Sequence, residues 1–243
     1  MTLCLLLALA ACGGGNDDRT ELRVLAASSL TEAFDTLEAT YEDDHAEVDV
    51  VLSYDSSATL AAQVIEGAPA DVLATADLPT MATVVDEGLV AGEPQPFATN
   101  TLALVTPPDN PAGVRGLADL EADDVLVAVC APSVPCGDAA LRLFQLAGVR
   151  VEATTEEDNV RGVLTKVVEG EVDAGVVYVS DAQAAGEDVA VVPVAEASQV
   201  VNVDPIAVLT GSAEPEAAQD WVDLVLSAEG QGVLEELGFG PVS

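Results

Sequence analysis

The sequence is poor in basic residues and in histidine, and each shortage excludes a class of function. Only 7 Lys and Arg residues stand against 43 Asp and Glu residues, which gives a net charge of −36. A surface this negative does not attract nucleic acid or an anionic membrane. A single histidine, no Gly-x-Ser-x-Gly nucleophile elbow and no phosphate-binding P-loop argue against an enzyme.

Aromatic residues are scarce too: one Trp, three Tyr and four Phe, although 50% of the 243 residues are hydrophobic. The core must therefore be built from Val, Leu, Ala and Ile. Parallel strands that are covered on both faces have this Val-rich composition. The length allows one large domain or two of about 100 residues each. The composition thus favours an α/β fold.

The amino terminus has the pattern of a lipoprotein signal. Leu3–Ala10 is a short apolar run, and Leu9-Ala10-Ala11-Cys12 matches a lipobox, in which signal peptidase cuts before the cysteine that carries the lipid. The run has about half of the ~20 residues that span a bilayer. We therefore expect residues 1–11 to be a signal peptide and residues 12–19 a lipidated tether outside the cell. No Lys or Arg precedes the run, which favours a start codon further upstream.

Four cysteines occur, and two of them lie in this leader. Cys130 and Cys136 are left, six positions apart. Outside the cytoplasm such a pair favours a disulfide, with free thiols as the alternative. A zinc site would need further Cys or His ligands, and the single histidine, His45, lies in an acidic helix end.

Strand and helix signals alternate from Leu22 onward, which predicts βαβ units and a parallel sheet. The predicted strands are Leu22–Ala26, Val48–Leu52, Val72–Ala76, Leu102–Thr106, Val125–Val129, Ala174–Val179, Val189–Val194 and Val201–Leu209. Helices are expected between them, and several end at a glycine, as at Gly148 and Gly170.

Four predicted helices begin with hydroxyl groups or a bare backbone turn. These starts are Ser28-Ser29, Ser56-Ser57, Pro135-Cys136-Gly137 and Asp158-Asn159-Val160. A helix start offers unpaired N–H groups and a positive dipole end, so it can bind an anion without Lys or Arg. A serine there is more often a simple N-cap. Because two starts carry paired serines, one can cap while the other faces a ligand.

Seven segments follow one another in an order that carries a resemblance. They are Ala26–Phe34, Ser56–Asp77, Val134–Gly137, Asp158–Gly162, Gly175–Tyr178, Pro205–Leu209 and Gly238-Phe239. In this order and spacing, the chain from about Leu22 to Pro241 resembles the periplasmic molybdate-binding proteins of ABC importers. Each motif alone is weak.

The resemblance implies five oxyanion-binding residues. Ser29 and Ser57 would each give a hydroxyl and a backbone N–H, Cys136 and Val160 a backbone N–H, and Tyr178 its hydroxyl. The plainer alternatives are a strand tyrosine satisfied by backbone at Tyr178 and helix packing at Val160. Cys136 departs from the alanine of the family, but a backbone amide survives that change.

The resemblance also implies the architecture and the partners. We expect two lobes, 20–101 with 205–243 and 102–204, each a mostly parallel sheet flanked by helices. Two strand-like crossings are expected near Asn100–Leu104 and Val203–Ile206, with the ligand in the cleft. The implied protein is a monomer without cofactor or metal that passes molybdate or tungstate to the permease and ATPase of an ABC transporter. The alternatives are another oxyanion such as sulfate, or a small organic acid, for which Arg161 would be the basic residue at hand.

Overall fold

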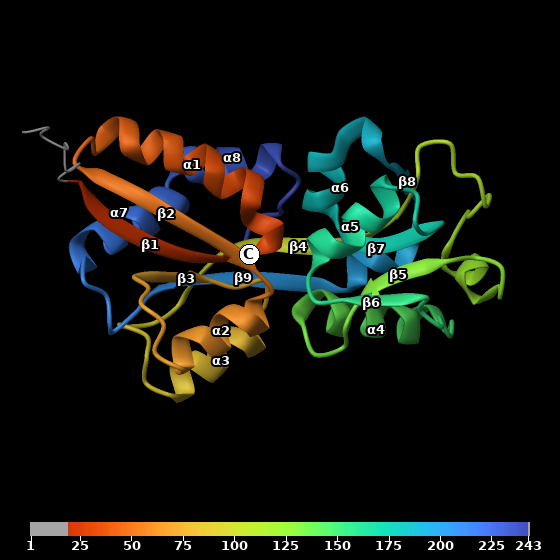
Figure 1. The fold of residues 1–243 in the computed structure, drawn as a ribbon, viewed down its shortest axis with the longest axis horizontal. Coiled ribbons are helices and arrows are strands. Elements are labelled where there is room, and N and C mark those ends of the chain that lie inside the picture. Colours follow the sequence, from red (N-terminus) through yellow and green to blue (C-terminus); the bar gives the residue numbers. More distant parts are fainter. Residues whose placement is uncertain (1–18, 243) are drawn as a thin grey trace, which may run out of the picture.

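The computed structural model describes residues 19–242 and shows two lobes joined by two long strands (Figure 1). The predicted signal peptide and Cys12 lie outside the described residues. Hydrogen bonding links the strands in the order β2-β1-β3-β9-β4-β7-β5-β6, with β8 beside β4. Within residues 19–242 no helix is long and apolar enough to cross a membrane.

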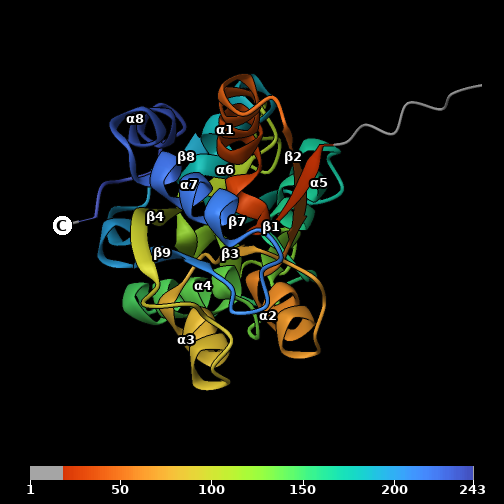
Figure 2. The ribbon, with the colours of Figure 1, turned by 90° about the vertical axis from the view of Figure 1, so that its left-hand side faces the viewer.

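The first lobe contains three parallel strands and one antiparallel strand. The strands are β1 (Thr20–Ala27), β2 (Val48–Asp55), β3 (Val72–Ala74) and the antiparallel β9 (Val201–Val208). Its helices are α1 (Thr31–Asp44), α2 (Ser57–Ile65), α3 (Leu78–Asp86), α7 (Pro215–Leu226) and α8 (Ala228–Glu236). Helices α1, α7 and α8 cover one face of the sheet, and α2 and α3 cover the other (Figure 2).

Alternation along β1 explains this double cover. Val24 and Ala26 belong to the core cluster under α1, whereas Leu25 belongs to the cluster under α2 and α3. Successive side chains of a strand point to opposite faces, so an apolar run is buried on both. Four of the few aromatic residues pack together beneath α1 and α7: Phe34, Tyr41, Phe97 and Trp221.

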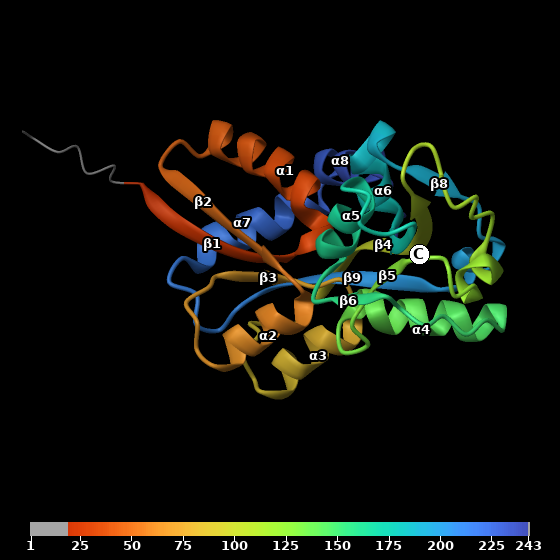
Figure 3. The same cartoon turned by 45° about the vertical axis from the view of Figure 1, so that its right-hand side comes forward.

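The second lobe repeats the plan. Its strands are the second half of β4 (Gln95–Thr106), then β7 (Ala174–Tyr178), β5 (Val127–Cys130), β6 (Thr155–Glu157) and β8 (Ala190–Val192). Its helices are α4 (Pro135–Ala147), α5 (Val160–Val168) and α6 (Val179–Ala185). Helix α4 lies on one side of the strands, and α5 and α6 lie on the other (Figure 3).

Strands β4 and β9 run antiparallel from lobe to lobe. They pair with each other around Asn100 and Asn202, while β4 continues against β7 and β9 continues against β3. The α/β fold with two crossing strands is confirmed, and the expected crossings fall inside β4 and β9. Strand β4 begins at Gln95, earlier than the predicted Leu102. The residue bounds of the two lobes remain a prediction.

Candidate functional site

The carboxyl ends of β1 and β2 meet the starts of α4 and α5 at a small cavity. Its lining residues are Ala27, Ser28, Ser29, Asp55, Ser56, Ser57, Ala76, Pro135, Cys136, Asn159, Val160 and Tyr178. All five residues that the sequence singled out therefore line one cavity. No Lys or Arg is among the lining residues, and Asp55 is the one carboxylate.

Ser29 reaches the cavity from the turn that follows β1. Residues Ser28–Leu30 form a short 3-10 helix that leads directly into α1. Ser29 is only 4% exposed, and its Oγ has no hydrogen-bond partner among the described residues. A buried hydroxyl without a partner is unfavourable, so an empty donor position in a cavity points to a ligand.

Ser56 and Ser57 form different hydrogen bonds. Ser56 is the N-cap of α2, because its Oγ accepts the N–H of Thr59 at 3.1 Å. Ser57, the first helical residue, accepts the N–H of Ala76 on its Oγ at 2.9 Å. Since that bond uses a lone pair of Ser57 Oγ, the hydroxyl proton remains free to be donated.

The start of α4 presents Cys136 in its first turn, where an amide has no partner within the helix. Cys136 is bridged to Cys130, the last residue of β5, with a Cα–Cα distance of 5.7 Å. The expected disulfide is therefore present. A Cβ added to Gly137 would lie 1.9 Å from the Ala131 carbonyl oxygen, so the loop packs directly on the helix start.

The start of α5 presents Val160. Asn159 caps this helix, since its Oδ1 accepts the N–H of Gly162 at 3.1 Å. The side chain of Val160 is 2% exposed and belongs to the core, so only its backbone N–H is available to a ligand. Side-chain packing and ligand binding are therefore compatible at this residue.

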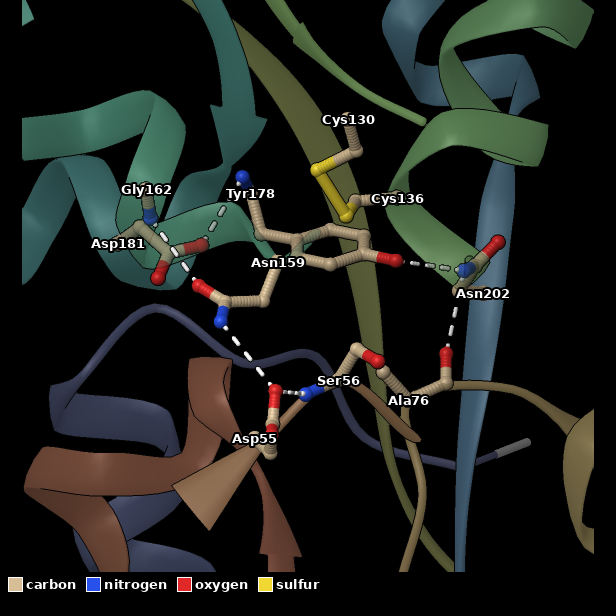
Figure 4. The surroundings of a disulfide bond; sticks show 10 residues. All are labelled: Asp55, Ser56, Ala76, Cys130, Cys136, Asn159, Gly162, Tyr178, Asp181 and Asn202. Carbon is tan, nitrogen blue, oxygen red and sulfur yellow. Dashed lines mark hydrogen bonds between the residues drawn. A yellow bond between two sulfur atoms is a disulfide. The ribbon is translucent and has the colours of Figure 1, made fainter. Parts of the chain in front are cut away.

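Tyr178 ends β7 and is 2% exposed. Its hydroxyl oxygen accepts the Nδ2–H of Asn202 at 2.9 Å, and its backbone N–H donates to Asp181 Oδ2 at 3.1 Å (Figure 4). Burial, followed by the charges of Asp204, Asp77 and Asp181, raises the pKa of Tyr178 well above its usual value. The phenol therefore keeps its proton and can donate it.

Sequence reasoning missed the polar groups behind these donors. Asn202 and Asp204 lie two positions apart on β9 and are 3% and 0% exposed. Neither carboxylate oxygen of Asp204 has a partner among residues 19–242, and burial raises the pKa of Asp204 well above its usual value. The available signal was the alternation of two polar residues within an otherwise apolar strand.

The basic residue nearest the site is engaged elsewhere. Arg161 forms an ion pair with Glu32 and donates from Nε to the Ser28 carbonyl at 3.4 Å. Asn159 Nδ2 also donates to Asp55 Oδ1 at 3.4 Å (Figure 4). These three contacts join Glu32 of α1, Ser28 and Asp55 of β2 in the first lobe to the start of α5 in the second lobe. They hold the two sides of the cavity together.

The cavity thus combines hydroxyl and first-turn amide donors from both lobes. Such a set suits a small anion with several oxygens, because a helix start directs N–H groups and positive potential at one point. Asp55 is the only lining carboxylate, and its Oδ1 accepts the N–H of Ser56 at 2.6 Å. No residue of the lining forms a nucleophile–base pair of the kind that acyl or phosphoryl transfer needs.

Comparison with known proteins shows what the chain is similar to. A family model described as bacterial extracellular solute-binding protein matches residues 22–240. The molybdate-binding protein ModA of Mycobacterium tuberculosis is 39% identical over 244 residues, covering 97% of this chain and 94% of the relative. The periplasmic molybdate-binding protein of Azotobacter vinelandii has the same fold, with a TM-score of 0.79, 19% identity and coverage of 91% and 100%. The sulfate-binding protein SubI of M. tuberculosis matches with a TM-score of 0.80, 18% identity and coverage of 93% and 88%.

Proposed function

The chain belongs to the family of bacterial extracellular solute-binding proteins, and from this premise we propose that it captures molybdate or tungstate for an ABC importer. The oxyanion lies between the lobes and receives hydrogen bonds from Ser29, Ser57, Cys136, Val160 and Tyr178. The protein carries its ligand unchanged and performs no reaction on it. The resemblance stated from the sequence is confirmed at the level of the family.

The unpartnered hydroxyl of Ser29 is the observation that carries this proposal. It lies in a cavity without Lys or Arg, beside first-turn amides and two hydroxyls whose protons are free. Hydrogen bonds to an ionised group are roughly twice as strong as neutral ones, so a neutral donor set can hold a dianion. Molybdate is favoured over other oxyanions by the 39% identical relative, which is named for binding it.

A titration of the purified protein with molybdate, tungstate, sulfate and phosphate tests this function. Calorimetry should show one tight site for molybdate and tungstate. Sulfate should bind more weakly by at least ~10-fold, or ~1.4 kcal/mol, because a smaller anion cannot reach donors from both lobes at once. Tightest binding of sulfate would replace molybdate by sulfate as the ligand, and binding of a carboxylate instead would reject the oxyanion site.

Anchoring through Cys12 is part of the same proposal. The lipobox Leu9-Ala10-Ala11-Cys12 supports it, as does membership of an extracellular family. Mass spectrometry of the membrane fraction should find a diacylglyceryl group on Cys12, and Cys12→Ser should remove this group. An unmodified Cys12 in protein from the membrane fraction would contradict lipid anchoring.

The donors also imply how the two lobes move. Ser29 and Ser57 come from the segment 20–101, whereas Cys136, Val160 and Tyr178 come from 102–204. A ligand that contacts both lobes stabilises the closed arrangement by its differential affinity. Small-angle scattering should therefore show a smaller radius of gyration with molybdate than without it, and an unchanged radius would count against interlobe binding.

A further inference from the structure

The two hydroxyl donors Tyr178 and Ser57 share an unusual feature: each already accepts a hydrogen bond from the protein. Asn202 Nδ2 donates to Tyr178 Oη at 2.9 Å, and the Ala76 N–H donates to Ser57 Oγ at 2.9 Å. Both hydroxyls line the same cavity. Because an accepted bond occupies a lone pair, the hydroxyl proton of each residue is directed away from that donor, toward the ligand.

Asn202 stands behind both of these donors. Its Nδ2 also donates to the Ala76 carbonyl at 3.1 Å (Figure 4). The backbone N–H of the same Ala76 donates to Ser57 Oγ. The buried side-chain amide of Asn202, on the crossing strand β9, therefore contacts the Tyr178 hydroxyl directly. It is linked to the Ser57 hydroxyl through Ala76. Asn202 is 3% exposed, so water does not substitute for these bonds.

The orientation of the Asn202 amide is determined by its third partner. Arg142 Nη2 donates to Asn202 Oδ1 at 2.7 Å. A guanidinium can only donate, so it requires the amide oxygen on its side. The reversed amide would place NH₂ against the guanidinium and its oxygen against the Ala76 carbonyl. Arg142 thus ensures that a donor, and not an acceptor, faces Tyr178.

We propose that Asn202 is a positioning residue that makes Tyr178 a donor only and thereby helps the site to reject oxyanions that carry a proton. This inference rests on the proposed function of oxyanion capture. An oxyanion with a proton must find an acceptor. At Tyr178 the lone pair in the ring plane is already used by Asn202, and at Ser57 one of the two lone pairs is used by the Ala76 N–H. Ser29 Oγ, which has no partner among the described residues, is a lining hydroxyl that can still accept. Rejection of protonated oxyanions by Tyr178 is therefore incomplete, and it depends on Asn202.

Asn202→Asp tests this role with almost no change in shape. Aspartate still accepts from Arg142, but its second oxygen now accepts from the Tyr178 hydroxyl. The phenolic proton then points at residue 202, and a lone pair faces the cavity. Sulfate and phosphate are the probes, because they are similar in size and both dianions at mildly alkaline pH, while only phosphate retains a proton. The added charge acts on both dianions alike, so it cancels in the ratio of their affinities.

Competition against bound molybdate gives this ratio for full-length protein. In the parent, sulfate should displace molybdate at lower concentration than phosphate does. In Asn202→Asp this preference should shrink by about tenfold, the effect of one hydrogen bond made or lost. In a Tyr178→Phe background, Asn202→Asp should leave the preference unchanged, because the hydroxyl that it reorients is gone.

Asn100→Asp is the matched control. Asn100 faces Asn202 in the β4–β9 register and is equally buried, but its amide donates to Ser180, which is outside the cavity lining. This variant should weaken both anions together and keep their ratio. If Asn202→Asp does not fold, Asn202→Leu replaces it: the freed lone pair of Tyr178 should again narrow the preference, and Asn100→Leu should not.

The outcomes separate the inference from the proposed function. No displacement and no binding of molybdate in the parent would reject oxyanion capture altogether. Molybdate binding with an unchanged sulfate-to-phosphate preference in the Asn202 variants would overturn the role of Asn202 alone. An equal change in the Asn100 controls, or a change that persists without the Tyr178 hydroxyl, would overturn it as well.

Discussion

Replacing Ser29 by alanine should separate stability from binding, because its Oγ is buried and has no partner among the described residues. In the ligand-free protein such a hydroxyl costs about 1–3 kcal/mol of desolvation. Alanine removes this cost and leaves the backbone N–H in place. We therefore expect the free energy of unfolding of ligand-free Ser29→Ala to equal that of the parent or to exceed it by about 1 kcal/mol.

The same substitution should weaken binding strongly. In the proposed complex the Ser29 hydroxyl donates to a buried dianion, and such a bond would contribute about 1.5–3 kcal/mol. The dissociation constant for molybdate should therefore rise by about 10- to 150-fold.

Ser56→Ala is the matched control, since Ser56 lines the same cavity but caps α2. Loss of its bond to the Thr59 N–H should cost about 0.5–2 kcal/mol of stability. Its hydroxyl already serves the helix, so the molybdate affinity should change by less than about threefold, or ~0.6 kcal/mol. Ser29→Ala should thus lower the molybdate affinity without lowering the stability, whereas Ser56→Ala should lower the stability with little effect on the affinity.

Urea unfolding followed by circular dichroism gives the stability, and calorimetric titration gives the affinity. Both need protein that has been dialysed free of oxyanion, because residual ligand stabilises the fold by mass action. A Ser29→Ala variant that is destabilised like Ser56→Ala and binds molybdate like the parent would refute the ligand role of the Ser29 hydroxyl.

Three further predictions concern the surroundings of the site. Burial raises the pKa of Asp181 from 3.8 to about 7. Between these two pH values the folded protein binds more protons than the unfolded chain, so the free energy of unfolding falls as the pH rises, by about 4 kcal/mol in full. Asp181→Asn should remove this part of the pH dependence, as measured by urea unfolding between pH 4 and 8. Arg161→Ala should weaken molybdate binding by less than about 1 kcal/mol, because its pair with Glu32 is partly exposed, and adding Glu32→Gln should cause no further loss by calorimetry. Reduction of the Cys130–Cys136 bridge should weaken molybdate binding less than Ser29→Ala does. The double variant Cys130→Ala with Cys136→Ala should bind molybdate nearly as the parent does, since residue 136 keeps its backbone amide. A large loss of affinity in that variant would show that the sulfur itself matters.

Local patterns account for most of the fold. The Val-rich runs were predicted as strands because burial on both faces leaves no polar alternation, and β5 and β7 are buried throughout. Gly148 was predicted to end a helix, and it does so with φ of 69°, a left-handed conformation that glycine adopts without strain. These features depend on residues that are neighbours in the sequence, so the sequence reveals them directly.

Elements that depend on distant partners were missed. The segment Gln95–Thr101 contains a proline and polar residues, yet it is a strand because it pairs with β9 about a hundred positions later. Helix α6 was missed because it follows β7 without a loop and its first residue, Val179, reads as the end of the strand; the turn into it is held by Asp181, which accepts the N–H of Tyr178. Neither pairing follows from local composition.

The candidate site divides in the same way. Ser29 and Ser57 could be named as candidates because they lie at the starts of helices that the sequence predicts, whereas Tyr178 was implied by the family resemblance. The role of Asn202 could not, because it consists entirely of bonds to residues 24 to 126 positions away. A hydroxyl can be recognised in a motif, but the group that orients its proton is visible only in three dimensions.

The negative surface of the chain repels an anionic ligand, whereas the hydrogen-bond donors of the cavity attract it. The two effects act at different distances and at different degrees of burial. The net charge of −36 repels a dianion from outside, but salt screens this repulsion beyond about 10 Å at 0.1 M. Beside Tyr178, burial raises the pKa of Asp204 well above its usual value and that of Asp181 to about 7, so burial disfavours negative charge on both carboxyl groups behind the donors. The donors of the cavity act at hydrogen-bond distance in a buried setting, where charge-assisted bonds are strongest. Affinity is therefore determined by the local donors, and the acidic surface acts mainly on the rate of capture.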